Sequence, residues 1–252
     1  MARTVGEDAA RLIPPPHEGW RQAVRAFHSE QFRVRASDHG VPFDIYINDA
    51  VDRVRTWAAT ARVRIRMDYG VLESFLRDGR YKNQFDTGTS NGVVAPGPRM
   101  LIEHTAFGIP PSARARHRPV YGYCTGSREQ SPQVLQYGDV VLELRPETNH
   151  RTTFTFGDSL DMSLASAQPP FCPRPLSRPS TLALHGAHDI RAAGELWEAT
   201  GYGYIEAQVF GVVGTRDVDT VIFTLDLRPN EPMKRLMVQL GINWRTVPGD
   251  EP

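Results

Sequence analysis

The sequence predicts an α+β protein in which N-terminal helices precede a mainly antiparallel β-sheet. Apolar residues recur at helical spacing before residue 80, whereas short β-type segments follow one another after it. Because helices come first and strands later, the order does not fit a doubly wound sheet. With 252 residues, 40% hydrophobic and 23% charged, the chain is expected to form one domain over residues 20–252, after a flexible arm at 1–19.

The part from residue 20 to residue 79 is predicted to be helical. Trp20, Val24 and Phe27 follow a helical period, and Asp49 is a suitable N-cap for a second helix. A short helix is expected from Val71 to Arg77, closed by Gly79.

The part from residue 80 to residue 252 is predicted to be rich in loops and strands. It begins with a polar loop, followed by a possible helix that holds residues 99–103. The strand candidates are Pro119–Cys124, Asp139–Leu144, Thr152–Phe156, Tyr204–Val213 and Thr220–Leu225. A rigid proline-rich loop is expected at 169–179 and a short amphipathic helix around 190–199.

The charge balance and the cysteine content exclude several classes of protein. Lys plus Arg equals Asp plus Glu, 29 each, so no global field attracts nucleic acid or anionic lipid. Nearly all of the positive charge is arginine, since the lysines are Lys82 and Lys234. Two cysteines without CxxC spacing argue against a disulfide scaffold and suit a reducing compartment. No signal peptide or long apolar run is found, so a cytoplasmic protein is expected.

Several motifs of catalysis are missing from the sequence. It contains no GxGxxG that opens a helix after a strand, no GxxxxGK[ST] and no GxSxG. His185 and His188 form the one close histidine pair, but a zinc site needs three or more ligands. We therefore expect a solvated loop there and no metal cofactor.

Four polar segments stand out between about residue 80 and residue 210: QFDTGTSNG, RPVYG, RTTFTFGDS and YIEAQVFG. In the last one, Glu206 and Gln208 are two positions apart on a predicted strand, so both side chains point to one face. Burying two such groups in an apolar strand is costly unless they have a function. The alternative is an amphipathic edge strand whose polar face contacts solvent.

The last three segments resemble, in order, the layout of the ADP-ribosyltransferase superfamily. In that family a first strand carries Arg or His, a second carries hydroxyl residues, and a late strand carries Glu two residues from Gln or Glu. The usual order is Gln/Glu-x-Glu, whereas this chain has Glu206 first and Gln208 second. All four segments, over about residues 75–225, are also similar to an uncharacterised bacterial domain family.

The resemblance implies an ADP-ribosyltransferase-like β core that uses NAD as a substrate. It implies that Glu206 stabilises the oxocarbenium character of the ribose, with Gln208 beside it, and that Arg118 pairs with the pyrophosphate. The other residues implied to bind NAD, orient Glu206 or stack on nicotinamide are Tyr121, Gly122, Thr152, Thr153, Phe154 and Ser159. Residues implied to close the site or to meet the acceptor are Gln84, Thr87, Thr89 and Ser90.

Two geometric expectations follow from this hypothesis. Glu206 and Gln208 should project into a cleft shared with Arg118 and Thr152, and the loop at 84–91 should line the same cleft. The acceptor is an unidentified intracellular protein, nucleic acid or small molecule. The alternatives are an NAD glycohydrolase or other hydrolase on the same pocket, and a non-catalytic module that binds a ligand or protein through a degenerate site. Arg99 and Arg151 are expected to be surface residues or structural ion-pair residues.

Overall fold

The computed structural model describes residues 33–34, 36–38, 40–46, 61–88, 96–107, 109–125, 132–156, 204–224 and 226–247. Some predicted features lie outside these residues: the arm at 1–19, the helix that begins at Asp49, the loop at 169–179, the helix near 190–199, and the pair His185 and His188. Helical residues at 33–34, 36–38 and 43–46 agree with the helical character expected after residue 20. Within the described part, no helix has the length and apolar character to cross a membrane.

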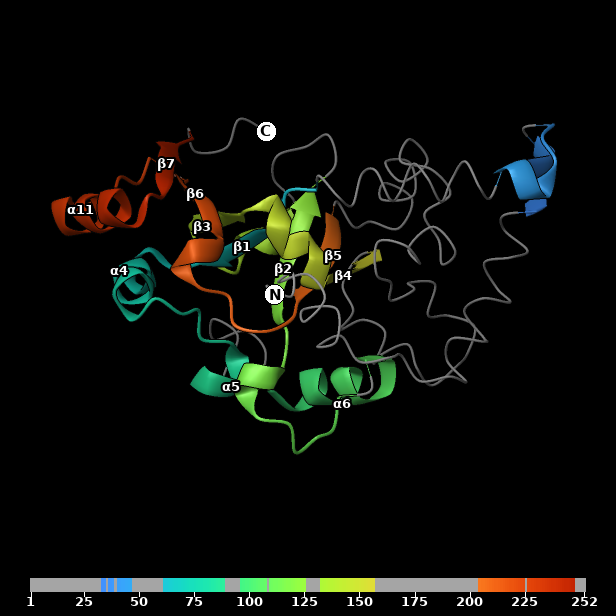
Figure 1. Cartoon of the computed structure of the whole chain (residues 1–252), viewed down its shortest axis with the longest axis horizontal. Helices are drawn as coiled ribbons and strands as arrows, with labels where there is room; N and C mark the ends of the chain where they lie inside the picture. Colours follow the sequence, from blue (N-terminus) through green and yellow to red (C-terminus); the bar gives the residue numbers. More distant parts are fainter. Residues whose placement is uncertain are drawn as a thin grey trace, which may run out of the picture.

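Seven strands form one sheet in the described part of the chain (Figure 1). They are β1 (Arg64–Met67), β2 (Val120–Thr125), β3 (Val140–Leu144), β4 (Thr152–Phe156), β5 (Tyr204–Val209), β6 (Val218–Phe223) and β7 (Asn243–Thr246). Their spatial order is β4-β5-β2-β1-β3-β6-β7. Neighbouring strands are antiparallel except for the parallel pair β6–β7. The prediction of an α+β protein with a mainly antiparallel sheet is confirmed.

From β1 onward, the helices of the described part lie between and after the strands. They are α4 (Tyr69–Asp78), α5 (Gln84–Thr87), α6 (Pro96–Phe107), α7 (Pro132–Leu135) and α11 (Glu231–Leu240), with short 3-10 turns η1 (Ala115–His117), η2 (Pro146–Arg151) and η4 (Thr215–Asp217). The predicted end of α4 is confirmed, because Gly79 adopts φ 71° and its N–H donates to the Phe75 carbonyl. Helix α11, which the sequence patterns did not predict, starts where the Asn230 side chain accepts from the Met233 N–H.

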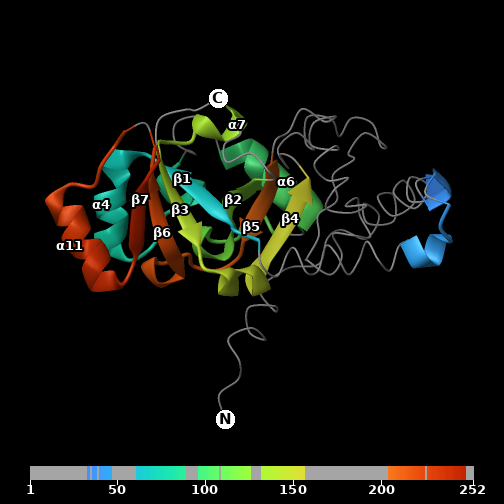
Figure 2. The ribbon, with the colours of Figure 1, turned by 90° about the horizontal axis from the view of Figure 1, so that it is seen from above.

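One face of the sheet is apolar and packs against α4 and α11. Figures 1 and 2 show these two helices side by side at the β6–β7 end of the sheet. From β1 the buried cluster takes Ile65 and Met67. The helices add Leu72, Phe75 and Leu76 from α4 and Met233 and Met237 from α11. Burial of one such side chain stabilises the folded protein by about 1.5–3 kcal/mol. The apolar face therefore holds in place the strands whose other face carries the polar residues.

Strand β1 was not predicted and lies inside the part expected to be helical. Its sequence, Arg-Ile-Arg-Met, is short, and half of its residues are charged, so it lacks the composition of a buried strand. It nevertheless occupies the middle of the sheet, between β2 and β3. The arginines are tolerated there because they find partners: Arg64, for example, forms an ion pair with Glu143 at 3.1 Å.

The sheet separates into two halves where β1 leaves β2. All four residues of β1 pair with β3, and all six residues of β2 pair with β5. Between β1 and β2 the described register consists of the single pair Arg64–Tyr123. At this crossing β1 lies directly on Gly122, where a Cβ atom would be 2.6 Å from the Arg64 carbonyl oxygen. Beyond it the strands diverge, which leaves space between them.

Candidate functional site

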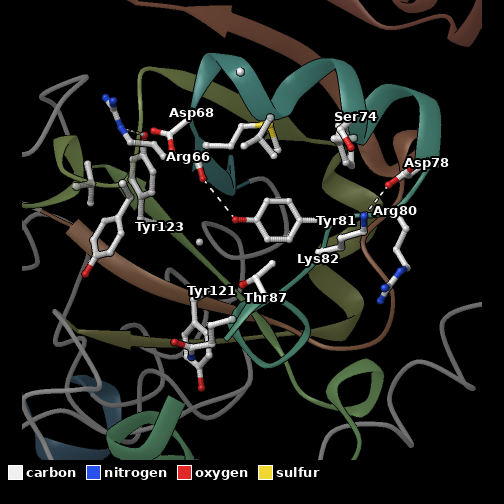
Figure 3. A pocket seen from close by; sticks show the side chains of 18 of the residues that line it. Arg66, Asp68, Ser74, Asp78, Arg80, Tyr81, Lys82, Thr87, Tyr121 and Tyr123 are labelled. Atoms are coloured by element: carbon white, nitrogen blue, oxygen red, sulfur yellow. Dashed lines mark hydrogen bonds and ion pairs between the residues drawn. The ribbon is translucent and has the colours of Figure 1, made fainter. Parts of the chain in front are cut away.

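A cavity of about 670 Å³ lies where β1 and β2 diverge. Its walls come from β1, β2, β5, α4, α5 and α6, so segments far apart in the sequence meet there (Figure 3). The volume is within the range of sites for small molecules and cofactors. Of the residues predicted for the site, those that line the cavity are Glu206, Tyr121, Gly122, Gln84 and Thr87.

Glu206 is a nearly buried carboxylate at the wall of this cavity. The residue is 4% exposed, and its Oε1 accepts a hydrogen bond of 2.7 Å from Gln208 Nε2. Its Oε2 lies 3.5 Å from Arg99 Nη1. The prediction that Glu206 and Gln208 share one face of the strand is confirmed. Gln208, fully buried behind Glu206, holds the carboxylate and does not line the cavity.

Arg99, from α6, lies between Glu206 and Tyr121. Its guanidinium carbon is 3.9 Å from the centroid of the Tyr121 ring, a cation–π contact. The Tyr121 hydroxyl donates to Glu103 Oε1 at 3.0 Å. Burial, and next the negative charge of Glu103, raise the pKa of Tyr121, so the phenol stays protonated and acts as a donor. Arg99 was expected to be a surface or structural ion-pair residue; its ion pair is with the carboxylate of the candidate site.

Arg118 does not contribute to the cavity, which corrects the expectation that it meets a ligand there. It is 2% exposed and forms an ion pair with Glu103 of α6. Its guanidinium also donates to the backbone carbonyls at 110, 111 and 113, and it covers the Phe85 ring at 4.2 Å. Since all three of its nitrogens donate to the protein, a pyrophosphate would have to displace buried bonds. Arg118 holds the segment before β2 in place.

Arg66, from β1, is the first-strand arginine that does line the cavity. It is buried, its Nε donates to the Tyr123 hydroxyl at 3.2 Å, and its Nη1 donates to the Gly138 carbonyl at 2.6 Å. The Tyr81 hydroxyl donates to the Arg66 carbonyl at 3.5 Å, as the dashed line in Figure 3 marks. Burial raises the pKa of Tyr81 to about 12. Because residues i and i+2 of a strand share a face, the pattern Arg64-Ile-Arg66 is the signal that could have indicated this residue.

Thr152 of β4 does not line the cavity as expected. Thr152 is fully buried, and its hydroxyl donates to the Thr148 carbonyl at 2.8 Å, so it closes the preceding turn. The backbones of Thr153 and Phe154 pair with β5, opposite Gln208 and Ala207. Their side chains lie outside the described residues, as does Ser159.

The polar loop predicted at 84–91 is a short helix over its first four residues. Asn83 caps α5 by accepting from the N–H groups of Phe85 and Asp86. Gln84 and Thr87 face the cavity, in agreement with the predicted position of this segment. Thr89 and Ser90 lie outside the described residues.

The fold and the site therefore define an α+β protein with a buried carboxylate and three guanidinium groups around a cavity in a split sheet. Residues 62–166 match a family described as "Protein of unknown function (DUF3626)". The chain is also similar to the "Gene 2 protein" of Mycobacterium phage D29, 28% identical over 185 residues, which cover 69% of this chain and 68% of the relative. The "Gene 2 protein" of Mycobacterium phage L5 is 28% identical over 184 residues, 67% of this chain and 66% of the relative.

Proposed function

We propose that this protein is an ADP-ribosyltransferase-like enzyme that takes NAD into the cavity at the sheet split. The observation that carries the proposal is Glu206: a desolvated carboxylate, held by Gln208 on one oxygen and Arg99 on the other, at the wall of a cavity of about 670 Å³. A hydrogen bond and an ion pair fix its orientation before any substrate arrives. Such preorganisation is how a site stabilises charge that develops only in the transition state.

The chemistry needs a negative charge beside the ribose. When the bond between C1′ and the nicotinamide nitrogen breaks, the ring acquires oxocarbenium character and nicotinamide leaves with the bonding electron pair. The Glu206 carboxylate would stabilise that positive charge more strongly than it stabilises neutral ribose, and only such a differential interaction raises the rate. Arg66 and Arg99 give the cavity guanidinium groups of the kind that bind the pyrophosphate of NAD.

The order of the strands supports the resemblance with a different assignment of residues. The arginine of the first strand is Arg66 on β1 and not Arg118. The hydroxyl groups of the second strand are those of Tyr121 and Tyr123 on β2, in place of Thr152 on β4. The late strand remains β5 with Glu206. All four of these side chains line the same cavity.

The position of Gln208 supports an enzyme over a degenerate binding module. The main reason to consider such a module is that Gln208 stands where the family usually has its glutamate. In this protein Gln208 lies outside the cavity and donates to Glu206, so a glutamine at that position leaves the carboxylate in place.

The test is nicotinamide release from NAD by the wild type and by Glu206→Gln. The substitution keeps the size of the side chain and removes the charge, so we expect turnover to fall by about 10²–10³ with little change in NAD binding. Glu143→Gln is the matched control, since Glu143 is a buried carboxylate of the same sheet that does not line the cavity. It pairs with Arg62 and Arg64, so this control should lose stability but keep turnover.

Three outcomes separate the candidate functions. Acceptor-dependent release supports a transferase, and equal release with water as the acceptor supports a glycohydrolase. If the wild type releases no nicotinamide with any acceptor tried, or if Glu206→Gln matches the wild type, the proposed function is wrong.

A further inference from the structure

An unsatisfied amide oxygen marks the α5 side of the cavity. Gln84 is 8% exposed and lines the cavity, and its Oε1 has no hydrogen-bond partner among the residues that the structure describes. A buried acceptor without a partner is destabilising, so such a group at a cavity wall is positioned for a ligand that donates an N–H or O–H.

A second, more open cavity of about 360 Å³ adjoins this side. It is lined by Arg80, Arg114 and Arg116, with Asp86 as its single carboxylate among the described residues. Arg80 also lines the main cavity, so the two cavities share a wall. Asp86 is already engaged, because Arg80 contacts it at 3.1 Å and the Asn83 N–H donates to it at 3.2 Å. The two other arginines leave a positive surface beside the mouth of the main cavity.

The backbone that carries Arg114 and Arg116 is held in place by hydrogen bonds from the buried side chains of Asn83 and Arg118. Arg116 belongs to the turn η1 and Arg114 is its N-cap, and Asn83 Nδ2 donates to the Ala115 carbonyl of this turn at 2.8 Å. Buried Arg118 binds the backbone of the same segment. The exposed guanidinium groups therefore project from an ordered scaffold, which lowers the entropy cost of binding a partner.

We propose that the acceptor is a polynucleotide that docks on Arg114 and Arg116 and inserts one base beside Gln84. This rests on the proposed function. Phosphates would lie on the arginines, and an exocyclic amino group of the base would donate to Gln84 Oε1. In the transfer, the bond from C1′ to nicotinamide breaks, a bond from C1′ to a nucleophilic atom of the polynucleotide forms, nicotinamide leaves with the bonding pair, and the nucleophile releases one proton to water.

A polynucleotide fits both features of the site better than an acidic peptide. Guanidinium groups bind phosphate in a bidentate fork, and each nucleotide joins such a phosphate to a base with N–H donors. An acidic peptide also supplies negative charge, but its charged side chains only accept hydrogen bonds, so a backbone N–H would have to reach Gln84 Oε1, whereas a base brings N–H donors on the group that enters the cavity. Placing one base in a pocket costs little when the strand is already single.

The docking surface is tested by fluorescence anisotropy with a labelled single-stranded oligonucleotide of mixed sequence. The variant carries Arg114→Gln and Arg116→Gln, and the control carries Arg235→Gln, an exposed arginine on α11 outside both cavities. Loss of two phosphate contacts should weaken binding at least tenfold at low salt. It should reduce the slope of log affinity against log salt by about 1.4, while the control keeps both values.

The base contact is tested with oligo(dC) and oligo(dT). The wild type should prefer oligo(dC), whose bases carry amino groups, and Gln84→Leu should lose that preference and keep the salt dependence. Equal binding of both oligonucleotides by the wild type overturns the role of Gln84. If the double variant binds like the control, or if polyglutamate displaces the oligonucleotide at equal charge concentration, the acceptor is not a polynucleotide.

Binding and turnover fail separately in these experiments. Arginine-dependent binding without nicotinamide release would keep the polynucleotide surface and refute the transferase. If nicotinamide release does not change with the oligonucleotide or with substitution of Arg114 and Arg116, the NAD chemistry is supported and the polynucleotide-binding surface is refuted.

Discussion

Replacing Arg118 with methionine distinguishes a buried structural arginine from a ligand for NAD. The substitution keeps an apolar stem of similar length and leaves Glu103, which is fully buried, without its ion-pair partner. Breaking one side of such a pair costs about 3–5 kcal/mol. For a protein of this size that corresponds to a fall in Tm of about 6–20 °C. Thermal unfolding followed by circular dichroism measures it.

The same variant should show a characteristic pH dependence. Burial raises the pKa of Glu103, and the hydrogen bond and charge of Arg118 oppose that rise. Without Arg118 the folded protein binds the Glu103 proton more tightly than the unfolded chain does. The stability deficit of the variant relative to the wild type should therefore be full above the folded pKa and shrink as the pH falls through it. Adding Glu103→Gln should recover part of the deficit at neutral pH.

Arg62→Met is the control, because this arginine also pairs with a glutamate but its side chain is 53% exposed. Exposed pairs contribute about 0–1 kcal/mol, so its Tm should stay within a few degrees of the wild type. If Arg118→Met has the same Tm as this control and instead weakens NAD binding, Arg118 is the pyrophosphate ligand that the resemblance implied, and its structural role is refuted.

Three further substitutions examine the sheet split and the site. Gly122→Ala should lower the free energy of unfolding by about 1–3 kcal/mol, because its Cβ meets the β1 backbone. The control Gly97→Ala has open space around its Cβ and should not destabilise the protein. Equal Tm values for the two variants would contradict the close approach of β1 to Gly122. The pKa of Tyr81 is raised to about 12, so the free energy of unfolding should fall as the pH rises from 10 to 12, and it should fall less in Tyr81→Phe. Spectrophotometric titration of the folded protein measures the ionisation of the tyrosines. If the wild type has a tyrosine that ionises near pH 10 and Tyr81→Phe lacks it, the raised pKa is refuted. Gln208→Leu removes the hydrogen-bond donor to Glu206, so the free energy of unfolding, measured by chemical denaturation, should fall by about 1.5–3 kcal/mol and nicotinamide release should slow. If neither the stability nor the release rate changes, Gln208 does not position Glu206.

Local patterns in the sequence determined the elements whose side chains alternate regularly. Strands β2 to β6 were predicted because each is a run of β-branched, aromatic or alternating residues, and the end of α4 was predicted because Gly79 can adopt a positive φ. The shared face of Glu206 and Gln208 follows from the period of a strand alone. These features depend on neighbours within a few residues, so they can be inferred without knowing the fold.

Only the tertiary structure decided which charged residues form the site. Arg66 and Arg118 both stand at or beside a short strand, and although the Arg64-Ile-Arg66 spacing marks Arg66 as a candidate, no local pattern shows that Arg118 is engaged elsewhere. Arg118 is engaged by Glu103 from α6, whereas Arg66 lies where β1 and β2 diverge and opens onto the cavity. That divergence depends on the pairing of β1 with β3 and of β2 with β5, and on the helices packed against the sheet. The energy that selects it is long-range burial, which no window of the sequence contains.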